Sequence, residues 1–259
     1  MLKFVSRIAL AFLFSAAAGA ALAASGTAMG VDPSAEAQGK QKRTLVVGAD
    51  IFIGERVVTG PEGQVQILFS DRTELVVGPR SALLIEDYLL RENGSAGKFA
   101  INALSGTFRF VTGGAPKDSY VIKTPTGTIG VRGTAFDFWV GQTAFYQLLY
   151  HGSTINCPVG VPMGDPRCVI ATDTCDLVQV SSNLAELLGH TDNLTGQSRN
   201  QLRSWFIYAV SQRPLLSQFR IQNAERCVTR PAGGGGIPSI VDPPADQPPP
   251  QKGDAEGDD

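Results

Sequence analysis

The stretch from Tyr120 to Val140, YVIKTPTGTIGVRGTAFDFWV, constrains the fold more than any other part of the sequence. Its first four residues form a short apolar run that Pro125 ends, because proline lacks a backbone donor and biases its predecessor toward extended geometry. Three glycines follow at a spacing of three residues: Gly127, Gly130 and Gly133. From Phe136 to Val140 the apolar residues alternate, as in a strand with one buried face. The stretch therefore predicts two strands joined by a tight, glycine-rich crossing.

Short apolar runs of this kind recur along residues 45–181. They are three to six residues long, and Gly, Pro, Asn and Asp separate them. Close, regular spacing of such runs predicts an all-β unit, and no helical period of 3.6 appears here. The runs are too short and too frequent for an immunoglobulin sandwich. We therefore expect a mainly β, rolled or solenoid-like domain over residues 45–181.

The first 44 residues predict an export signal and a linker. Lys3 and Arg7 precede an apolar, alanine-rich run, and Ala21-Leu22-Ala23 is a small-x-small cleavage site. We expect residues 1–23 to be a signal peptide cut after Ala23, with an uncleaved anchor as the alternative. Residues 24–44 are small, polar and unpatterned, so we expect a flexible arm. No later run approaches the ~20 apolar residues of a membrane span, so no integral span is expected after cleavage.

The C-terminal part of the sequence predicts helices and then a tail. Leu184, Leu187 and Leu188 have helical spacing, with a cap at Ser182 or Asn183 and a stop at Gly189. A second helix is expected from Ser198 to Gln212, with one apolar stripe: Leu202, Trp205, Phe206, Ala209 and Val210. We expect this segment, residues 182–230, to pack near the C-terminal end of the β unit and shield its last coil. Residues 231–259 are rich in Gly, Pro and Asp and predict a disordered tail.

The chain has four cysteines: Cys157, Cys168, Cys175 and Cys227. An even number in an exported chain predicts two disulfides and a periplasmic or secreted location. Four cysteines allow three pairings, and the sequence does not choose among them. We favour Cys157–Cys168 across a hairpin, with Cys175–Cys227 fastening the C-terminal segment. The alternative is a zinc site, but the close pairs of zinc knuckles are absent, so no metal is predicted.

Charge and titratable residues exclude several function classes. The formal net charge is -2, and a chain without a basic excess is a poor candidate for nucleic-acid binding. The only histidines, His151 and His190, are far apart and lack metalloprotease spacing. Four carboxylates are candidates for a hydrolase site: Asp71, Glu74, Glu86 and Asp87. We assign Asp71 to a hairpin turn, and Glu86 and Asp87 to the end of a strand. We therefore predict no enzyme, no catalytic residue and no cofactor.

The glycine crossing and the aromatic residues after it each allow a binding role. A phosphate cradle would need a helix after the glycines, whereas a strand follows, so we assign the glycines to tight turns and close approach. Arg132 either ties down turn carbonyls or Asp137, or contacts a partner or anion. An aromatic group could bind a sugar or protein, or could belong to the core: Trp139, Phe145, Tyr146 and Tyr150.

Four pieces of the sequence resemble the FecR family, export-side modules of bacterial iron-sensing regulators. They are GADIFIGERVVTG (48–60), GQVQILFSDRTELVVGP (63–79), ALSGTFRFVTG (103–113) and the stretch 120–140. The most specific part is TPTGTIGVRGTAFDF, with these motif positions: Thr124, Pro125, Gly127, Gly130, Arg132, Gly133, Thr134 and Phe136. The resemblance implies an all-β, solenoid-like module on the outer side of the inner membrane.

The sequence departs from the plan of the iron-sensing regulators. Met1–Arg7 is too short to bind a sigma factor, and the C-terminal part lacks the usual receptor-interacting domain. The module is therefore carried over and the anti-sigma role is not. We predict a non-enzymatic exported FecR-domain protein that binds an envelope protein in signalling or assembly. The alternative is a ligand- or glycan-binding module that uses Arg132, Trp139, Tyr146 and Tyr150.

Overall fold

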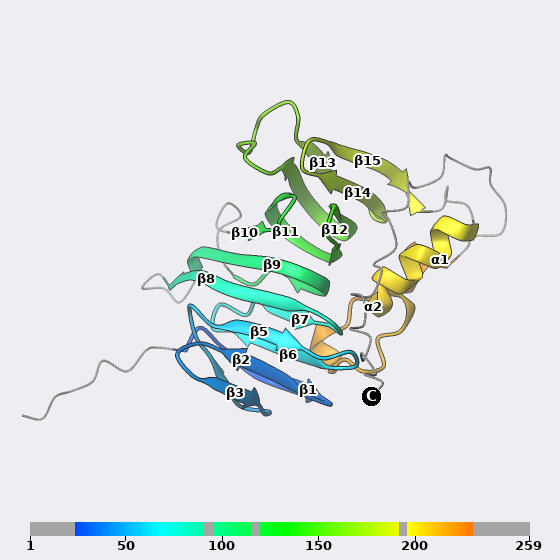
Figure 1. Cartoon of the computed structure of the whole chain (residues 1–259). Helices are drawn as coiled ribbons and strands as arrows, with labels where there is room; N and C mark the ends of the chain where they lie inside the picture. The colour runs from blue at the N-terminus through cyan, green and yellow to red at the C-terminus, as the bar shows by residue number, and fades with distance from the viewer. Residues whose placement is uncertain (1–23, 91–95, 115–119, 192–195, 230–259) are drawn as a thin grey trace, which may run out of the picture.

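The computed structural model describes residues 24–90, 96–114, 120–191 and 196–229. The predicted signal peptide and the predicted tail lie outside them. Within the described residues, fifteen strands form one hydrogen-bonded sheet (Figure 1). They are β1 Gly26–Asp32, β2 Ala35–Gln38, β3 Lys42–Leu45, β4 Asp50–Ile51, β5 Arg56–Thr59, β6 Gln64–Phe69, β7 Glu74–Val77, β8 Ala82–Leu90, β9 Ala96–Val111, β10 Tyr120–Lys123, β11 Gly127–Val140, β12 Ala144–Pro158, β13 Val169–Ala171, β14 Asp176–Ser181 and β15 Ala185–His190.

The sheet folds over on itself because three long strands take part in two different runs of pairing. The first part of β9 pairs with β8 and β10, and its last six residues pair with β7 and β11. Likewise β11 pairs with β10 up to Val131 and with β9 from Ala135. Two layers result. We call one the bare layer; it holds β2, β3, β5, β8, β10 and β13, with the parts of β9 and β11 that pair with β10 and the part of β12 that pairs with β13. We call the other the covered layer; it holds β1, β4, β6, β7, β14 and β15, with the parts of β9 and β11 that pair with each other and the part of β12 that pairs with β14.

The inner faces of the two layers share one hydrophobic core. Phe99 of the bare layer contacts Phe69 and Phe110 of the covered layer, with ring centroids 4.8 and 5.6 Å apart. Tyr120 adds a second contact to Phe110 at 5.8 Å. The alternating apolar residues of each strand supply this core, as the period-two pattern predicts. The mainly β fold is confirmed, whereas the strands form a single open sheet and a solenoid is not confirmed.

Glycines in left-handed conformation lie where the long strands pass from one layer to the other. Gly106 in β9 has φ 105°, Gly133 in β11 has φ 64°, and Gly152 in β12 has φ 88°. A Cβ on Gly152 would lie 2.2 Å from the carbonyl oxygen of Gly133, so these two bends nest against each other. Glycine is required at such a site because it alone combines this backbone conformation with so close an approach.

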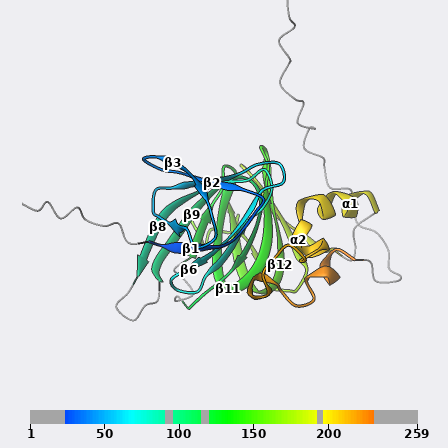
Figure 2. The ribbon, with the colours of Figure 1, turned by 90° about the horizontal axis from the view of Figure 1, so that it is seen from below.

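The chain after the sheet runs along the outer face of the covered layer. It contains α1 Gly196–Trp205, α2 Ile207–Val210 and two short 3-10 helices, η2 Ser217–Phe219 and η3 Ala224–Cys227. Figure 2 shows α1 and α2 beside β11 and β12. Further along, the carbonyl oxygen of Pro214 accepts hydrogen bonds from Gln64 and Gln66 of β6. We call residues 196–229 the C-terminal segment.

The predicted flexible arm over residues 24–44 is wrong, because β1 and β2 and most of β3 lie there. Their inward positions are small residues, among them Ala28, Ala35 and Ala37, which are buried without forming an apolar run. β2 lies between β3 and β5, and β1 pairs with β6. The sheet therefore starts at Gly26, well before residue 45.

The first predicted C-terminal helix is also wrong, because its leucines lie in and just before β15. Pairing with β14 decides the outcome, and Gly189, expected to stop a helix, instead follows a bulge in this pairing with φ 86°. The second predicted helix is present but breaks at Phe206 into α1 and α2. It packs on the outer face of the covered layer, where Leu188 of the last strand, β15, packs against the same cluster.

Candidate functional site

The FecR-like motif spans the two layers. In the turn before β11, the Thr124 hydroxyl accepts hydrogen bonds from the backbone amides of Thr126 and Gly127 at 3.3 and 3.0 Å. Pro125 is exposed at the tip of this turn. Thr134 lies past the bend, where its backbone amide donates to the Thr112 hydroxyl at 3.0 Å. Phe136 then points into the core between the layers. These contacts hold the two halves of β11 in place.

Two motif glycines allow neighbouring groups to approach the strand closely. A Cβ on Gly127 would lie 2.3 Å from the carbonyl oxygen of Cys157, and one on Gly130 would lie 2.6 Å from the Met163 sulfur. Met163 belongs to the loop that the Cys157–Cys168 disulfide closes. The glycines thus provide space for packing, which is the role that the strand after them indicated.

A buried ion pair joins β9 and β11 on the outer face of the covered layer. Arg109 donates to Asp137 at 2.7 and 3.0 Å, and both side chains are at most 1% exposed. The Tyr150 hydroxyl donates to Asp137 at 2.6 Å, and Arg109 also bonds to the Gln212 side chain. Gln212 in turn bonds to the backbone amide and carbonyl of Ile221. The network therefore ties the C-terminal segment to the FecR-like strands.

The environment of this network shifts its titrating groups. Burial disfavours the charge of Arg109, but the Asp137 carboxylate outweighs burial and holds the Arg109 pKa above its ordinary value. Burial, and then the charge of Asp137, raise the pKa of Tyr150 well above its ordinary value. The same two causes raise the pKa of Tyr208, whose ring lies 5.7 Å from the Arg109 guanidinium. Arg109 therefore stays charged and both hydroxyls stay protonated at neutral pH.

The aromatic residues predicted as a binding surface are largely covered. Tyr146 and Tyr150 are 1% and 5% exposed, and Phe145 lies in the core between the layers. Trp205 of α1 stacks on Trp139 at 4.6 Å and on Tyr146 at 4.4 Å. The prediction of an open aromatic surface is therefore wrong for both tyrosines. The Trp139 and Tyr146 rings are the surface on which Trp205 of the C-terminal segment packs. Of the four predicted aromatic residues, only Trp139 is half-buried and the others are buried.

Arg132 is exposed at the bend of β11 and opposes Ser153 of β12. Asp137, one of its two predicted structural partners, is buried and binds Arg109. The sequence reasoning missed Arg109. The signal was present in the matching triplets Phe108-Arg109-Phe110 and Phe136-Asp137-Phe138, but only the strand register brings Arg109 and Asp137 opposite each other.

Both favoured disulfides are present. Cys157–Cys168 joins β12 to the residue before β13, and Cys175–Cys227 joins the residue before β14 to η3. Two disulfides fit an oxidising, extracellular or periplasmic location. Over the part of the chain that the structure describes, no group of three or more metal-ligating side chains occurs, and no helix is long and apolar enough to cross a membrane.

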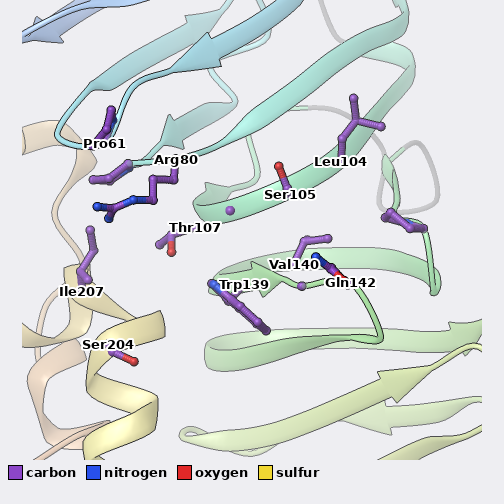
Figure 3. A pocket seen from close by; sticks show the side chains of 14 residues that line it. Pro61, Arg80, Leu104, Ser105, Thr107, Trp139, Val140, Gln142, Ser204 and Ile207 are labelled. Atoms are coloured by element: carbon purple, nitrogen blue, oxygen red, sulfur yellow. The ribbon is translucent and has the colours of Figure 1, made fainter. Parts of the chain in front are cut away.

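A pocket of about 560 Å³ lies between the sheet and the C-terminal segment (Figure 3). Arg80, Ser105, Trp139 and Gln142 from the sheet side line it, with Ser204 and Ile207 on the helical side. Arg80 has left-handed φ of 53°, and its backbone amide donates to the Gly60 carbonyl at 2.9 Å. The pocket was not predicted, because its walls come from six separate parts of the sequence.

Exposed apolar side chains gather where the sheet ends at β13 and β15. Ile170 in β13 is 59% exposed, and Leu187 in β15 is 43% exposed. Leu187 pairs with Val178, which belongs to the core between the layers, so the two side chains lie on the same face of the sheet. Since Val178 is buried and Leu187 is exposed, the core ends between β14 and β15 at this position. β13 and β15 have the terminal places in their layers, and their outer backbone edges lack a neighbouring strand within the described residues. We call this region, residues 169–171 and 184–190, the open end of the sheet.

Residues 55–152 match the family model described as FecR protein. This part of the chain is similar to the FecR family. The resemblance read from the sequence is thus confirmed, and the bends, the glycine crossing and the Arg109–Asp137 pair all lie within the matched residues. The strands β1 to β4 and β13 to β15, with the C-terminal segment, extend the fold beyond the matched residues.

Two solved structures with similarity to the chain are crystal structures of a candidate anti-sigma factor from Parabacteroides distasonis. Their TM-scores are 0.40 and 0.38, and their sequences are 9% and 12% identical to this chain. Each alignment covers 51% of this chain and 57% of that protein. No curated protein matches the chain.

Proposed function

We propose that the chain is a non-enzymatic FecR-domain protein that acts in the cell envelope by binding another protein, in signalling or assembly. The observation that carries this proposal is the open end of the sheet. An unpaired edge at the end of a sheet is a template for association with another chain, and this end presents Ile170, Leu184 and Leu187 to solvent. Large apolar side chains grouped at one place are typical of a protein-binding surface.

The open end also defines the chemistry of the partner. An unpaired strand edge binds an extended segment through main-chain hydrogen bonds, and the exposed leucines offer contacts for its alternate side chains. Glu186 and Asp173 are exposed beside this edge and give it an acidic character. The proposed partner therefore supplies an extended, apolar segment with basic flanking residues. Similarity to the FecR family and the two disulfides support an envelope location for the encounter.

The glycan-binding alternative receives no support from the aromatic strands. Tyr146 and Tyr150 are buried under the C-terminal segment, and one face of the Trp139 ring is stacked on Trp205. A sugar ring would need an open aromatic face, which the two tyrosines do not offer. We therefore keep protein binding as the proposed function.

The test is crosslinking capture from the envelope fraction, repeated with the purified captured protein. The wild-type chain is expected to bind one defined protein, and Leu187→Lys is expected to weaken that binding at least about ten-fold by placing a charge in the apolar contact. Leu216→Lys is the matched control, because Leu216 is 42% exposed but lies on the C-terminal segment. Equal binding by Leu187→Lys and the wild type, or no binding by the purified protein, would refute the proposal.

A further inference from the structure

The pocket beside Trp139 has one charged group on its wall. Of the residues that line it, only Arg80 carries a charge, and this side chain is exposed. With the residues that the structure describes, the Arg80 guanidinium forms no hydrogen bond and no ion pair. Figure 3 shows Arg80 between Pro61 and Ile207, with Trp139 and Gln142 across the pocket. An arginine in this position presents a free set of donors to an anionic group that enters the pocket.

The backbone fixes where Arg80 leaves the chain. Arg80, which follows Pro79, has a left-handed φ, and this conformation is uncommon for a residue other than glycine. The Arg80 amide bonds to the Gly60 carbonyl, and the neighbouring Ser81 hydroxyl accepts from the Thr107 amide at 2.9 Å. The loop that carries Arg80 is thus held to two other parts of the FecR-like region. Such preorganisation lowers the entropy that binding would otherwise cost.

The opposite wall is apolar and rigid. Trp139 is held between its neighbours: Trp205 stacks on it with planes 13° apart, and a Cβ on Gly141 would lie 2.4 Å from its six-membered ring. Leu104, Val140 and Ile207 continue the apolar lining, and the exposed Ser105 adds a hydroxyl. A ligand that fits therefore has a carboxylate beside an apolar group.

We propose that this pocket binds a short acidic peptide segment, with its carboxylate on Arg80 and a neighbouring apolar side chain against Trp139. A volume of about 560 Å³ lies within the range of ligand pockets. A peptide fits better than an acidic sugar because one face of the Trp139 ring is already stacked on Trp205. The site is separate from the open end, so this proposal does not depend on the proposed function.

Tryptophan fluorescence can report whether the pocket is occupied. The chain has two tryptophans, Trp139 and Trp205, and they stack on each other at the pocket wall. Intrinsic tryptophan fluorescence of the full chain therefore reports occupancy of this site. The probes are the blocked tripeptide acetyl-Leu-Glu-Leu-amide, its neutral match acetyl-Leu-Gln-Leu-amide, and glucuronate as a free acidic sugar.

The acidic tripeptide is expected to give a saturable fluorescence change that the neutral tripeptide does not give. Arg80→Gln is expected to weaken this binding about ten-fold, since one charge-assisted contact is lost. Arg72→Gln is the matched control, because Arg72 is also exposed with left-handed φ of 67° but lies outside the pocket lining. It should bind the acidic tripeptide as the wild type does.

Three results would overturn the proposal. They are no saturable change with the acidic tripeptide up to millimolar concentration, equal binding by Arg80→Gln, and a response to glucuronate alone. The Arg80→Gln chain is first checked for an unchanged thermal unfolding midpoint, and Arg80→Lys provides a second variant that keeps the charge. Arg80→Lys should retain part of the affinity, because lysine keeps the attraction and loses the planar fork.

Discussion

The outer faces of the two layers differ in almost every respect. The covered layer carries aromatic rings, the buried Arg109–Asp137 pair and the C-terminal segment that the Cys175–Cys227 disulfide fastens. The bare layer carries surface ion pairs such as Lys123–Glu86, whose side chains are 51% and 23% exposed. The same long strands supply both faces, so strand composition alone does not explain the difference.

The difference shows what the C-terminal segment does for the fold. Phe108-Arg109-Phe110 and Phe136-Asp137-Phe138 alternate inward rings with an outward charge, which on an open sheet would be two solvated residues. Packing of α1 and α2 over this face removes the charges from water, and Gln212 and Tyr150 then complete their hydrogen bonds. The covered face is therefore an internal interface, whereas Ile170 and Leu187 at the open end are exposed in the part of the chain that the structure describes.

The largest effect is expected from breaking the buried pair. Asp137→Ala leaves Arg109 charged and buried, which should lower the free energy of unfolding by about 3–5 kcal/mol. Glu86→Ala removes the partner of Lys123 on the bare layer and should cost less than about 1 kcal/mol. Urea unfolding of the wild type, Asp137→Ala and Glu86→Ala measures both losses in the free energy of unfolding. Similar costs for the two substitutions would mean that the faces do not differ as described.

The two disulfides allow a second comparison between the layers. Their sequence separations are 52 residues for Cys175–Cys227 and 11 residues for Cys157–Cys168. By loop-closure entropy, replacing both cysteines of a pair with alanine should cost about 4 kcal/mol for the first and about 3 kcal/mol for the second. Limited proteolysis should cut the C-terminal segment faster only in the first variant. Faster cutting in the second variant instead would contradict the assignment of Cys175–Cys227 as the fastening of the segment.

The bends that join the layers predict a smaller difference between two glycines. Gly133→Ala meets no atom within 4 Å and should cost about 1–2 kcal/mol for the left-handed backbone alone. Gly152→Ala also forces its Cβ against the Gly133 carbonyl, so about 2–3 kcal/mol is expected. Thermal unfolding of both variants gives the order. A larger loss at Gly133 would show that the bends are not nested in this way.

The buried tyrosines are expected to change the stability of the protein least near neutral pH. Their effect becomes clear only in alkaline solution. Burial, followed by the charge of Asp71, raises the pKa of Tyr88 between the layers to about 12, and burial followed by the charge of Asp137 raises the pKa of Tyr150 well above its ordinary value. Unfolded tyrosine ionises near pH ~10, so this stabilisation is complete below that pH and is lost as the pH rises toward 12. Tyr150→Phe should lessen the loss.

Tyrosinate absorbance measured against pH tests this expectation. Tyr88, Tyr150 and Tyr208 should contribute almost no tyrosinate absorbance at pH ~10, and the absorbance should then rise cooperatively as the protein unfolds. Tyr150 ionising at its ordinary pH in the folded protein would contradict its position under the C-terminal segment.

The sequence predicts well those parts of the fold that local patterns determine. The strands between residues 45 and 181 follow from short apolar runs separated by turn residues, and the turn at Asp71-Arg72-Thr73 follows from local side-chain bonding. In the structure the Thr73 amide donates to Asp71 at 3.0 Å, as expected of such a turn. The Tyr120 hydroxyl also donates to Asp71 at 2.7 Å, and this long-range contact has no local signal.

The errors occur where pairing with distant strands overrides local pattern. Residues 26–38 lack an apolar run, and they form strands because β5 and β6 supply the hydrogen bonds. Leu184, Leu187 and Leu188 have helical spacing, yet β14 pairs with this segment as a strand. The aromatic group was mistaken for a surface because the sequence does not show which strand face the C-terminal segment covers.

Hydroxyl-radical footprinting of the full chain tests the central claim most directly, since it compares the two outer faces in one experiment. After correction for intrinsic reactivity, Tyr146, Tyr150 and Trp205 should be protected, while Met163 and Ile170 on the bare layer should be labelled. The same pattern should hold at every radical dose that leaves the protein folded. Labelling of Tyr146 and Tyr150 at rates like those of Met163 and Ile170 would contradict the account, because the C-terminal segment would then not cover that face.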